Sequence, residues 1–163
     1  MTPERTIADA LGVLVGRAFR VNLYDELTAD VAPALTPATY PVISAISRFG
    51  PSTASSLADE LGLDRSVVSR RAMTLVQAGL LHTTSRPDDK RQVLFELTDT
   101  GTECVHTMRL RLDAAVARHI SQWTSPERAD FASLLARFVE AGALGADPGE
   151  GQTSSKRSHP AIS

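Results

Sequence analysis

Residues 57–70, LADELGLDRSVVSR, and residues 79–98, GLLHTTSRPDDKRQVLFELT, decide the fold of this chain. The first stretch predicts two short helices, over 53–61 and 64–78, separated by a tight turn. Gly62 permits the left-handed backbone that such a turn requires, and Asp64 is a residue type that caps helices. A small residue at Ala58 and a β-branched residue at Val68 allow two helices to cross closely. This spacing is typical of a helix-turn-helix.

The second stretch changes the hydrophobic period from helical to alternating after Leu80. Residues 81–84 and 92–97 read as strands, and the polar run 85–91 between them reads as a turn. We therefore expect a β-hairpin with a charged tip, the wing of a winged helix-turn-helix.

The flanking sequence predicts four further helices. Apolar residues recur at helical spacing over 7–23, which predicts the first of them. A second helix opens at Thr36-Pro37 and ends at Gly50. Thr98 caps a third, which ends near His119, and Ser125-Pro126-Glu127 opens the last, which continues through Ala141. Pro41 should make the second of these irregular in its first turn. The expected fold class is mainly α, with six helices and a two- to three-stranded β-wing. The expected regions are 35–98 as the DNA-binding domain, 5–34 with 99–143 as a helical dimerisation region, and 145–163 as a disordered tail.

The bulk composition excludes several classes of protein. The chain has 163 residues, a net charge of −2 and one cysteine, Cys104, so neither a strongly basic nucleic-acid coat protein nor a disulfide framework is expected. Charged residues interrupt the apolar stretch 7–23, which suits neither a secretory signal nor a membrane span, and a cytoplasmic protein is expected. The four histidines are scattered, and the common enzyme motifs are missing from the sequence. No metal, cofactor or catalytic activity is predicted.

Positive charge is nevertheless concentrated locally, with six basic against three acidic residues over 63–91. If Val68, Ala72 and Leu75 face the core, an advance of about 100° per residue turns Ser66, Arg70, Met73 and Gln77 outward. Arginine and glutamine on such a face can hydrogen-bond guanine and adenine in a major groove. In the wing, an Asp89–Arg91 pair would stiffen Arg91 for a minor groove. The candidate DNA-binding residues are Arg65, Ser66, Ser69, Arg70, Gln77, Arg86, Asp89, Lys90 and Arg91.

These motifs resemble the MarR family of bacterial regulators. The matching residues are Leu35-Thr36, Leu57-Ala58, the run 61–66, Val68-Ser69-Arg70, Gly79-Leu80-Leu81, Pro87, Asp89-Lys90-Arg91 and Leu97-Thr98 with Gly101. The resemblance implies a homodimer in which N- and C-terminal helices interlock, and double-stranded DNA with an inverted-repeat operator as the partner. It also implies that ligands or oxidants often weaken DNA binding, with repression the commoner outcome. Arg71 and Met73 depart from the family pattern, which leaves the base preference undetermined.

Several alternatives stay open at the level of sequence. The acidic balance also allows a winged-helix protein that binds another protein and not DNA. Arg71 could contact phosphate or form an internal ion pair. A small-molecule effector could contact Trp123, Tyr24 or Tyr40, and Cys104 is expected to be an inert buried thiol more than a redox sensor.

Overall fold

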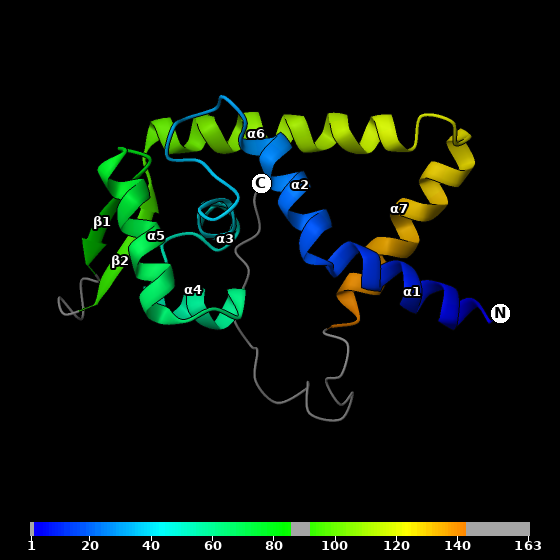
Figure 1. Ribbon diagram of the computed structural model, residues 1–163, viewed down its shortest axis with the longest axis horizontal. Coiled ribbons are helices and arrows are strands. Elements are labelled where there is room, and N and C mark those ends of the chain that lie inside the picture. The colour runs from blue at the N-terminus through cyan, green and yellow to red at the C-terminus, as the bar shows by residue number, and fades with distance from the viewer. Residues whose placement is uncertain (1, 86–91, 143–163) are drawn as a thin grey trace, which may run out of the picture. The chain divides into compact units, whose positions relative to one another are not determined.

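The computed structural model describes residues 2–85 and 92–142, which divide into two compact units between Ala117 and Arg118. The predicted wing tip and the predicted tail, 145–163, therefore lie outside the described residues. Figure 1 labels the elements in chain order. They are α1 (Pro3–Val15), α2 (Arg17–Thr28), α3 (Tyr40–Phe49), α4 (Ala54–Leu61), α5 (Arg65–Gln77), β1 (Leu81–Ser85), β2 (Val93–Leu97), α6 (Asp99–His119) and α7 (Ser125–Glu140).

The mainly helical fold class is confirmed, but the described residues form seven helices where six were predicted. The difference arises at Gly16, which divides the predicted N-terminal helix into α1 and α2. Its ψ angle of 142° is not helical, and its N–H donates to the Val13 carbonyl at 3.1 Å. Glycine is a poor helix former, and a Cβ here would lie 3.0 Å from that same carbonyl oxygen.

The hydrophobic core of the first unit forms around α3. Four residues of α3 are buried, and α4, α5, β2 and α6 pack apolar side chains against them. The helix predicted to open at Thr36-Pro37 begins instead at Tyr40, with Thr39 in the N-cap position, so the irregular first turn expected from Pro41 was wrong. The Thr36 N–H donates to the Thr39 hydroxyl at 3.0 Å, which ties the preceding turn to the helix. Pro41 falls in the first turn, where a missing N–H costs no helical hydrogen bond.

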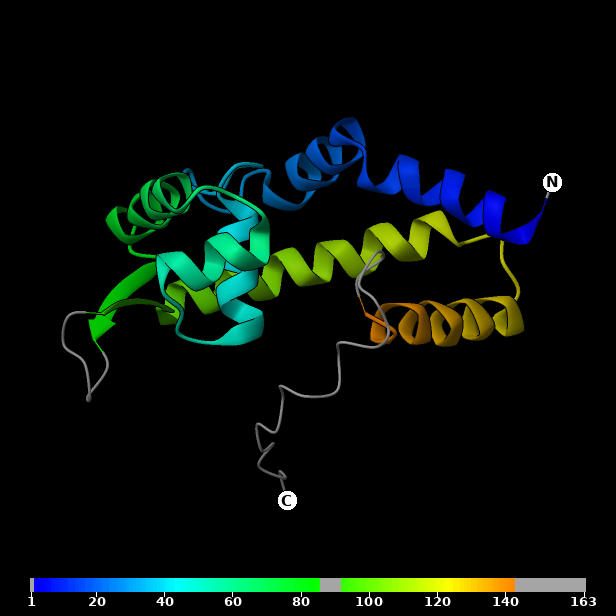
Figure 2. The same ribbon diagram turned by 90° about the horizontal axis from the view of Figure 1, so that it is seen from below.

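The hairpin is antiparallel, with Leu81 opposite Leu97 and Ser85 opposite Val93. Ser52 extends this sheet beside β2 by a single antiparallel bridge, because it exchanges backbone hydrogen bonds with Phe95 at 3.1 and 2.9 Å. In Figure 2 the two strands extend away from α4 and α5. The wing is thus a two-stranded sheet extended by one bridging residue.

The second unit contains α7, whose start is fixed by Thr124. The Thr124 N–H and hydroxyl both donate to the Glu127 carboxylate, at 2.7 and 2.8 Å, in a capping box. The Trp123 ring meets Phe131 edge-on with centroids 5.2 Å apart. Over the described part of the chain, no helix combines the length and apolar character that crossing a bilayer would need.

Candidate nucleic-acid interface

The turn between α4 and α5 has the geometry that the sequence predicts. Gly62 adopts a left-handed conformation (φ 61°, ψ 39°), and the Leu63 N–H donates to the Ala58 carbonyl at 3.1 Å. Asp64 occupies the N-cap position of α5, but its side chain makes no capping hydrogen bond, so its expected side-chain cap was wrong. Ala58 and Val68 are buried at the crossing. The two helices form a helix-turn-helix.

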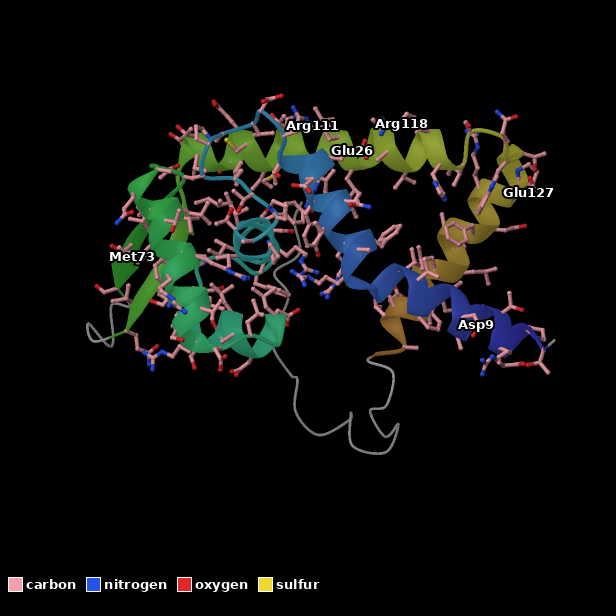
Figure 3. All side chains as sticks on the ribbon, in the orientation of Figure 1. Asp9, Glu26, Met73, Arg111, Arg118 and Glu127 are labelled. Atoms are coloured by element: carbon pink, nitrogen blue, oxygen red, sulfur yellow. The ribbon has the colours of Figure 1, made fainter. Side chains whose placement is uncertain are left out.

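The two faces of α5 differ sharply in burial. Val68, Ala72 and Leu75 are each 0 % exposed, as the helical spacing predicts. The side chains on the opposite side, which we call the outer face, are exposed: Ser66, Arg70, Met73 and Gln77. Arg65 is also exposed and Ser69 is half-buried at the edge. Figure 3 labels Met73, whose side chain is 41 % exposed despite being apolar.

Polar groups of the outer face are free to bind an external partner. Within residues 2–85 and 92–142, Arg5 pairs with Asp9, and His82 contacts Glu96. Neither Arg65 nor Arg70 takes part in these contacts. A guanidinium that is exposed and not held by a carboxylate can donate two parallel hydrogen bonds to a planar acceptor.

The wing carries the remaining predicted contacts. Arg86, Asp89, Lys90 and Arg91 lie in the segment 86–91, outside the described residues, and their DNA-binding roles stay predictions. In the described part of the hairpin, His82 lies opposite Glu96, and its Nε2 is 3.3 Å from the Glu96 carboxylate.

A short junction sets the hairpin against α5 and α6. The Thr98 hydroxyl donates to the Gly79 carbonyl at 2.7 Å and accepts from the Gly101 N–H at 3.0 Å. A Cβ on Gly101 would lie only 2.0 Å from the Leu80 carbonyl oxygen. The Leu97-Thr98 and Gly101 motif therefore holds the end of β2, the start of β1 and the first turn of α6 together.

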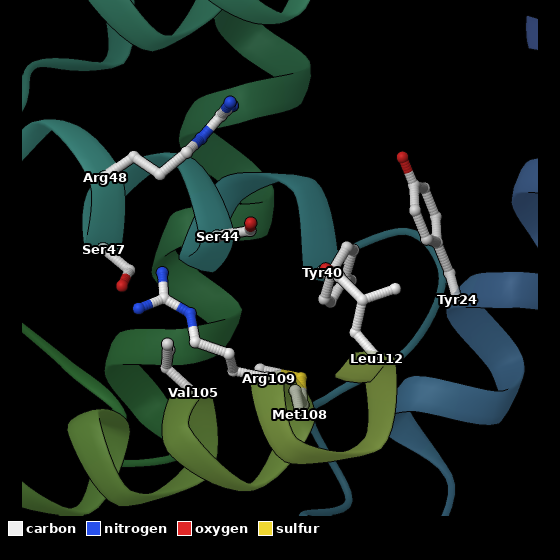
Figure 4. Close-up of a pocket in the computed structure, with 9 residues that line it drawn as sticks. All are labelled: Tyr24, Tyr40, Ser44, Ser47, Arg48, Val105, Met108, Arg109 and Leu112. Atoms are coloured by element: carbon white, nitrogen blue, oxygen red, sulfur yellow. The ribbon is translucent and has the colours of Figure 1, made fainter. Parts of the chain in front are cut away.

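A cavity of about 340 Å³ lies between α2, α3 and α6 in the first unit, and we call it the tyrosine cavity (Figure 4). The Tyr24 and Tyr40 rings meet at its edge, with centroids 4.6 Å apart. Burial raises the pKa of the Tyr40 phenol, and a hydrogen bond with Ser44 partly offsets this rise. Its lining residues are Tyr24, Tyr40, Ser44, Ser47, Arg48, Val105, Met108, Arg109 and Leu112.

The tyrosine cavity could not be assembled from sequence, although Tyr24 and Tyr40 were singled out there. Arg48 and Arg109 stand 61 residues apart in the chain and belong to no shared motif. Only the packing of α3 against α6 brings them to one cavity. Trp123, the third aromatic residue considered, lies in the other unit and packs on Phe131.

Cys104 belongs to the hydrophobic core of the first unit. Burial raises the pKa of its thiol, and the nearby Glu103 carboxylate raises it further. A thiol with a raised pKa has less of the reactive thiolate at neutral pH. Among the described residues, no group of three or more histidine, cysteine or acidic side chains is arranged to hold a metal ion.

The sequence profile of the MarR family matches residues 35–92, which contain the helix-turn-helix and the first strand of the hairpin, β1. A HTH-type transcriptional regulator of Bacillus subtilis, YxaD, is 26% identical over 85% of this chain and 94% of its own length. Residues 35–92 are thus a MarR-family domain. A second B. subtilis relative, the HTH-type transcriptional repressor MdtR, is 27% identical over 66% of this chain and 69% of its own length.

Solved structures agree with this assignment over nearly the whole described chain. RV1404 from Mycobacterium tuberculosis superposes with a TM-score of 0.68 at 27% identity, covering 88% of this chain and 97% of that one. Wild-type MarR from E. coli, in its apo form, gives a TM-score of 0.65 at 23% identity, covering 85% and 98%. Together with the sequence relatives, these matches identify a transcriptional regulator of the helix-turn-helix type.

Proposed function

We propose that this MarR-family regulator binds double-stranded DNA as a homodimer and represses transcription from an inverted-repeat operator. The observation that carries the proposal is the contrast between the two faces of α5. Its inner face is fully buried, whereas its outer face presents Arg70 and Gln77 to solvent. A helix held in this way can enter a major groove, with each bidentate base contact contributing roughly 1–3 kcal/mol of discrimination.

Contacts around the outer face would set the position of the protein on the duplex. Arg65, Ser66 and Ser69, at the N-terminal end of α5, are suited to phosphates, which fix register without reading sequence. Arg86, Asp89, Lys90 and Arg91 in the wing are proposed to extend the contact, with Arg91 in the adjacent minor groove. In this proposal the DNA-binding domain is residues 35–98, and the dimerisation region is residues 5–34 with 99–143. Repression has the support of the similarity to the repressor MdtR.

The homodimer is supported by apolar helix faces that the described structure leaves exposed. Helix α1 has no buried residue, and Ile7, Val13, Leu14 and Val15 are 47–66 % exposed. Helix α7 also has no buried residue. Its exposed apolar side chains are Phe131, Leu134, Leu135, Phe138 and Val139. Exposed apolar helix faces of this kind mark an interface, and a second copy of the chain is the proposed occupant.

The tyrosine cavity is the proposed effector site. Arg48 and Arg109 supply positive charge, Ser44 and Ser47 supply hydroxyls, and the two tyrosines supply aromatic surface. A small organic anion with a flat apolar body matches this lining. Because the cavity joins α2 and α6 to α3 of the winged domain, an occupant could shift the two recognition helices relative to each other and release the DNA.

Selection of genomic DNA fragments with the purified protein tests the proposed function. We expect a small set of fragments with inverted repeats, bound with an affinity that falls steeply as salt is raised. Arg70→Ala should relax sequence preference, and Arg91→Ala should weaken binding without unfolding the protein. Unchanged affinity of both variants for the selected fragment at moderate salt would contradict the proposal.

The net charge of −2 also allows a second function, a winged-helix protein that binds another protein and not DNA. Salt dependence discriminates between the two. Failure to enrich any genomic fragment, or a DNA affinity that does not change with ionic strength, would favour the second function.

A further inference from the structure

The side chain of Thr98 joins the end of α5, the proposed recognition helix, to the start of α6. Its hydroxyl donates to the Gly79 carbonyl at 2.7 Å and accepts from the Gly101 N–H at 3.0 Å. A hydroxyl has a single donor, and here that donor is used by Gly79 while a lone pair holds Gly101. The backbone N–H of Thr98 also donates to the Leu80 carbonyl, at 3.2 Å. One residue therefore bonds to the chain ends of two helices.

The end of α5 is a fixed structure. Gly79 has a left-handed φ of 71°, and its N–H donates to the Val76 carbonyl at 2.9 Å. The Leu80 N–H donates to the Leu75 carbonyl, also at 2.9 Å. These two bonds form a Schellman motif, which satisfies the last carbonyls of a helix. The carbonyls that follow, those of Gly79 and Leu80, are the ones that Thr98 binds, so Thr98 is linked to α5 through backbone alone.

The start of α6 is equally fixed. Thr98 directly precedes Asp99, the first residue of α6, and its hydroxyl caps the helix as the sequence predicts. A Cβ on Gly101 would lie 2.0 Å from the Leu80 carbonyl oxygen, so the first turn of α6 lies directly against the backbone that follows α5. Further along α6, buried Cys104 and Met108 pack in the core. Helix α6 is thus a firm base for the C-terminal end of α5.

The orientation of a helix of this length has a large effect at its ends. The 13 residues of α5 make it roughly 20 Å long. A tilt of about 10° around its N-terminal end would move its C-terminal end by roughly 3 Å, whereas a binding contact tolerates only about 0.5 Å. Gln77, exposed on the outer face near Gly79, would move most. Arg65, at the opposite end, would move least.

We propose that Thr98 is a positioning residue for DNA binding, which holds the C-terminal end of α5, and with it Gln77, where base contact requires it. This inference rests on the proposed function of α5 as the recognition helix. Loss of the hydroxyl would leave α5 folded, because its buried inner face is unchanged, but would orient it less precisely. The loss would affect discrimination between operator and unrelated DNA, since phosphate attraction does not depend on base contacts.

The test is fluorescence anisotropy of Thr98→Val with the genomic fragment that the wild type selects and with an unrelated duplex of equal length. Valine keeps the shape of threonine but lacks the hydroxyl. We expect the affinity for the selected fragment to fall about tenfold, the loss of roughly one base contact, while the affinity for the unrelated duplex stays unchanged. Thr98→Ser keeps the hydroxyl and should bind both duplexes as the wild type does.

Folding of each variant is established by circular dichroism and by a melting temperature well above that of the binding measurement. Thr98→Ala also lacks the hydroxyl and is measured in parallel, so the test does not depend on the folding of one variant. Loss of one cap and one hydrogen bond is small against the stability of a typical domain, so both variants are expected to fold.

A double-mutant cycle separates positioning from a general structural role. Gln77→Ala should weaken binding of the selected fragment in the wild type and clearly less in Thr98→Val, because Gln77 is already displaced in that variant. Arg65→Ala should have the same effect in both backgrounds, because the N-terminal end of α5 does not depend on Thr98. A purely structural Thr98 predicts instead that both effects are the same in the two backgrounds.

Thr107→Val is the matched control, because it removes a hydroxyl of α6 that donates at 3.0 Å to the Glu103 carbonyl within the same helix. It should leave both affinities unchanged. The inference is overturned if Thr98→Val binds the selected fragment as tightly as the wild type, or if Thr98→Ser or Thr107→Val weakens binding equally. An equal effect of Gln77→Ala in both backgrounds would also overturn it.

Failure of the proposed function has a different result in the same measurements. A wild type that selects no fragment would overturn DNA binding, and the role of Thr98 with it. A wild type that binds its fragment specifically while Thr98→Val does the same would overturn the role of Thr98 alone.

Discussion

At the scale of single residues, burial divides the side chains of α5 into those that pack in the core and those that are exposed to solvent. Val68, Ala72 and Leu75 are sealed in the core, so their size matters more than their chemistry. Arg70 and Gln77 are exposed, so their hydrogen-bonding groups matter instead. Met73 is the exception, because it is apolar and yet 41 % exposed between these two polar residues.

Met73 is expected to contact the methyl group of a thymine when the outer face lies in the major groove. Replacing that thymine by deoxyuridine in the selected operator should weaken binding about fourfold, since one buried methyl contributes about 0.8 kcal/mol. The measurement is fluorescence anisotropy with each thymine of one half-site replaced in turn. In Met73→Ala the deoxyuridine effect should disappear. An equal effect in both proteins would contradict the contact.

Gly101 is expected to be essential for stability. A methyl group there would lie 2.0 Å from the Leu80 carbonyl oxygen, and backbone cannot move aside easily. Gly101→Ala should lower the free energy of unfolding by roughly 1–3 kcal/mol, as overpacking does. Urea denaturation measures the change. Gly12→Ala is the control, because nothing lies within 4 Å of a Cβ at that position, and equal losses in the two variants would refute the explanation.

At the scale of secondary-structure elements, most of the winged domain could be predicted because its signals are local. The bounds of α4 and α5 follow from Thr53, Gly62 and the buried spacing around Val68. Other features depend on contacts between distant segments and carry no local signal. The Ser52–Phe95 bridge is such a feature. The break at Gly16 is local, but the sequence pattern does not mark it, because an isolated glycine inside an apolar helical pattern does not by itself end a helix.

The start of α7 gives a prediction about pH. Hydrogen bonds from the Thr124 N–H and hydroxyl lower the pKa of the Glu127 carboxylate below its ordinary value of 4.5. A carboxylate whose pKa is lower in the folded state stabilises the fold above its unfolded pKa, and this contribution is lost as pH falls through the folded pKa. Between about pH 5 and pH 3, the melting temperature of the wild type should therefore fall further than that of the Glu127→Gln protein.

Glu140→Gln serves as the control, because Glu140 is the last residue of the same helix and has no capping role. Its melting temperature should follow the wild-type pH dependence. Thr124→Ala should lower stability by about 1 kcal/mol at neutral pH through loss of the N-cap. A Glu127→Gln protein with the same acid sensitivity as the wild type would show that the capping box does not act in solution.

At the scale of the whole molecule, the sequence predicts a fold class and a family but not the proposed effector site. The tyrosine cavity combines α2 and α6 with α3 of the winged domain, so its lining comes from residues that are remote in the chain. The apolar faces of α1 and α7 are visible in sequence as helical periodicity, whereas what covers them is a property of the assembly. The proposed function therefore depends on how two copies would present α5 to one duplex.

A hydroxyl-radical footprint on the selected operator fragment tests that central claim most directly. Two symmetric copies predict two protected half-sites related by a dyad, with centres about one helical turn, roughly 10 base pairs, or a whole multiple of it apart. The Arg70→Ala protein should lose this pattern on the same fragment at equal salt. Absence of protection, or a single unsymmetrical protected patch, would contradict the account.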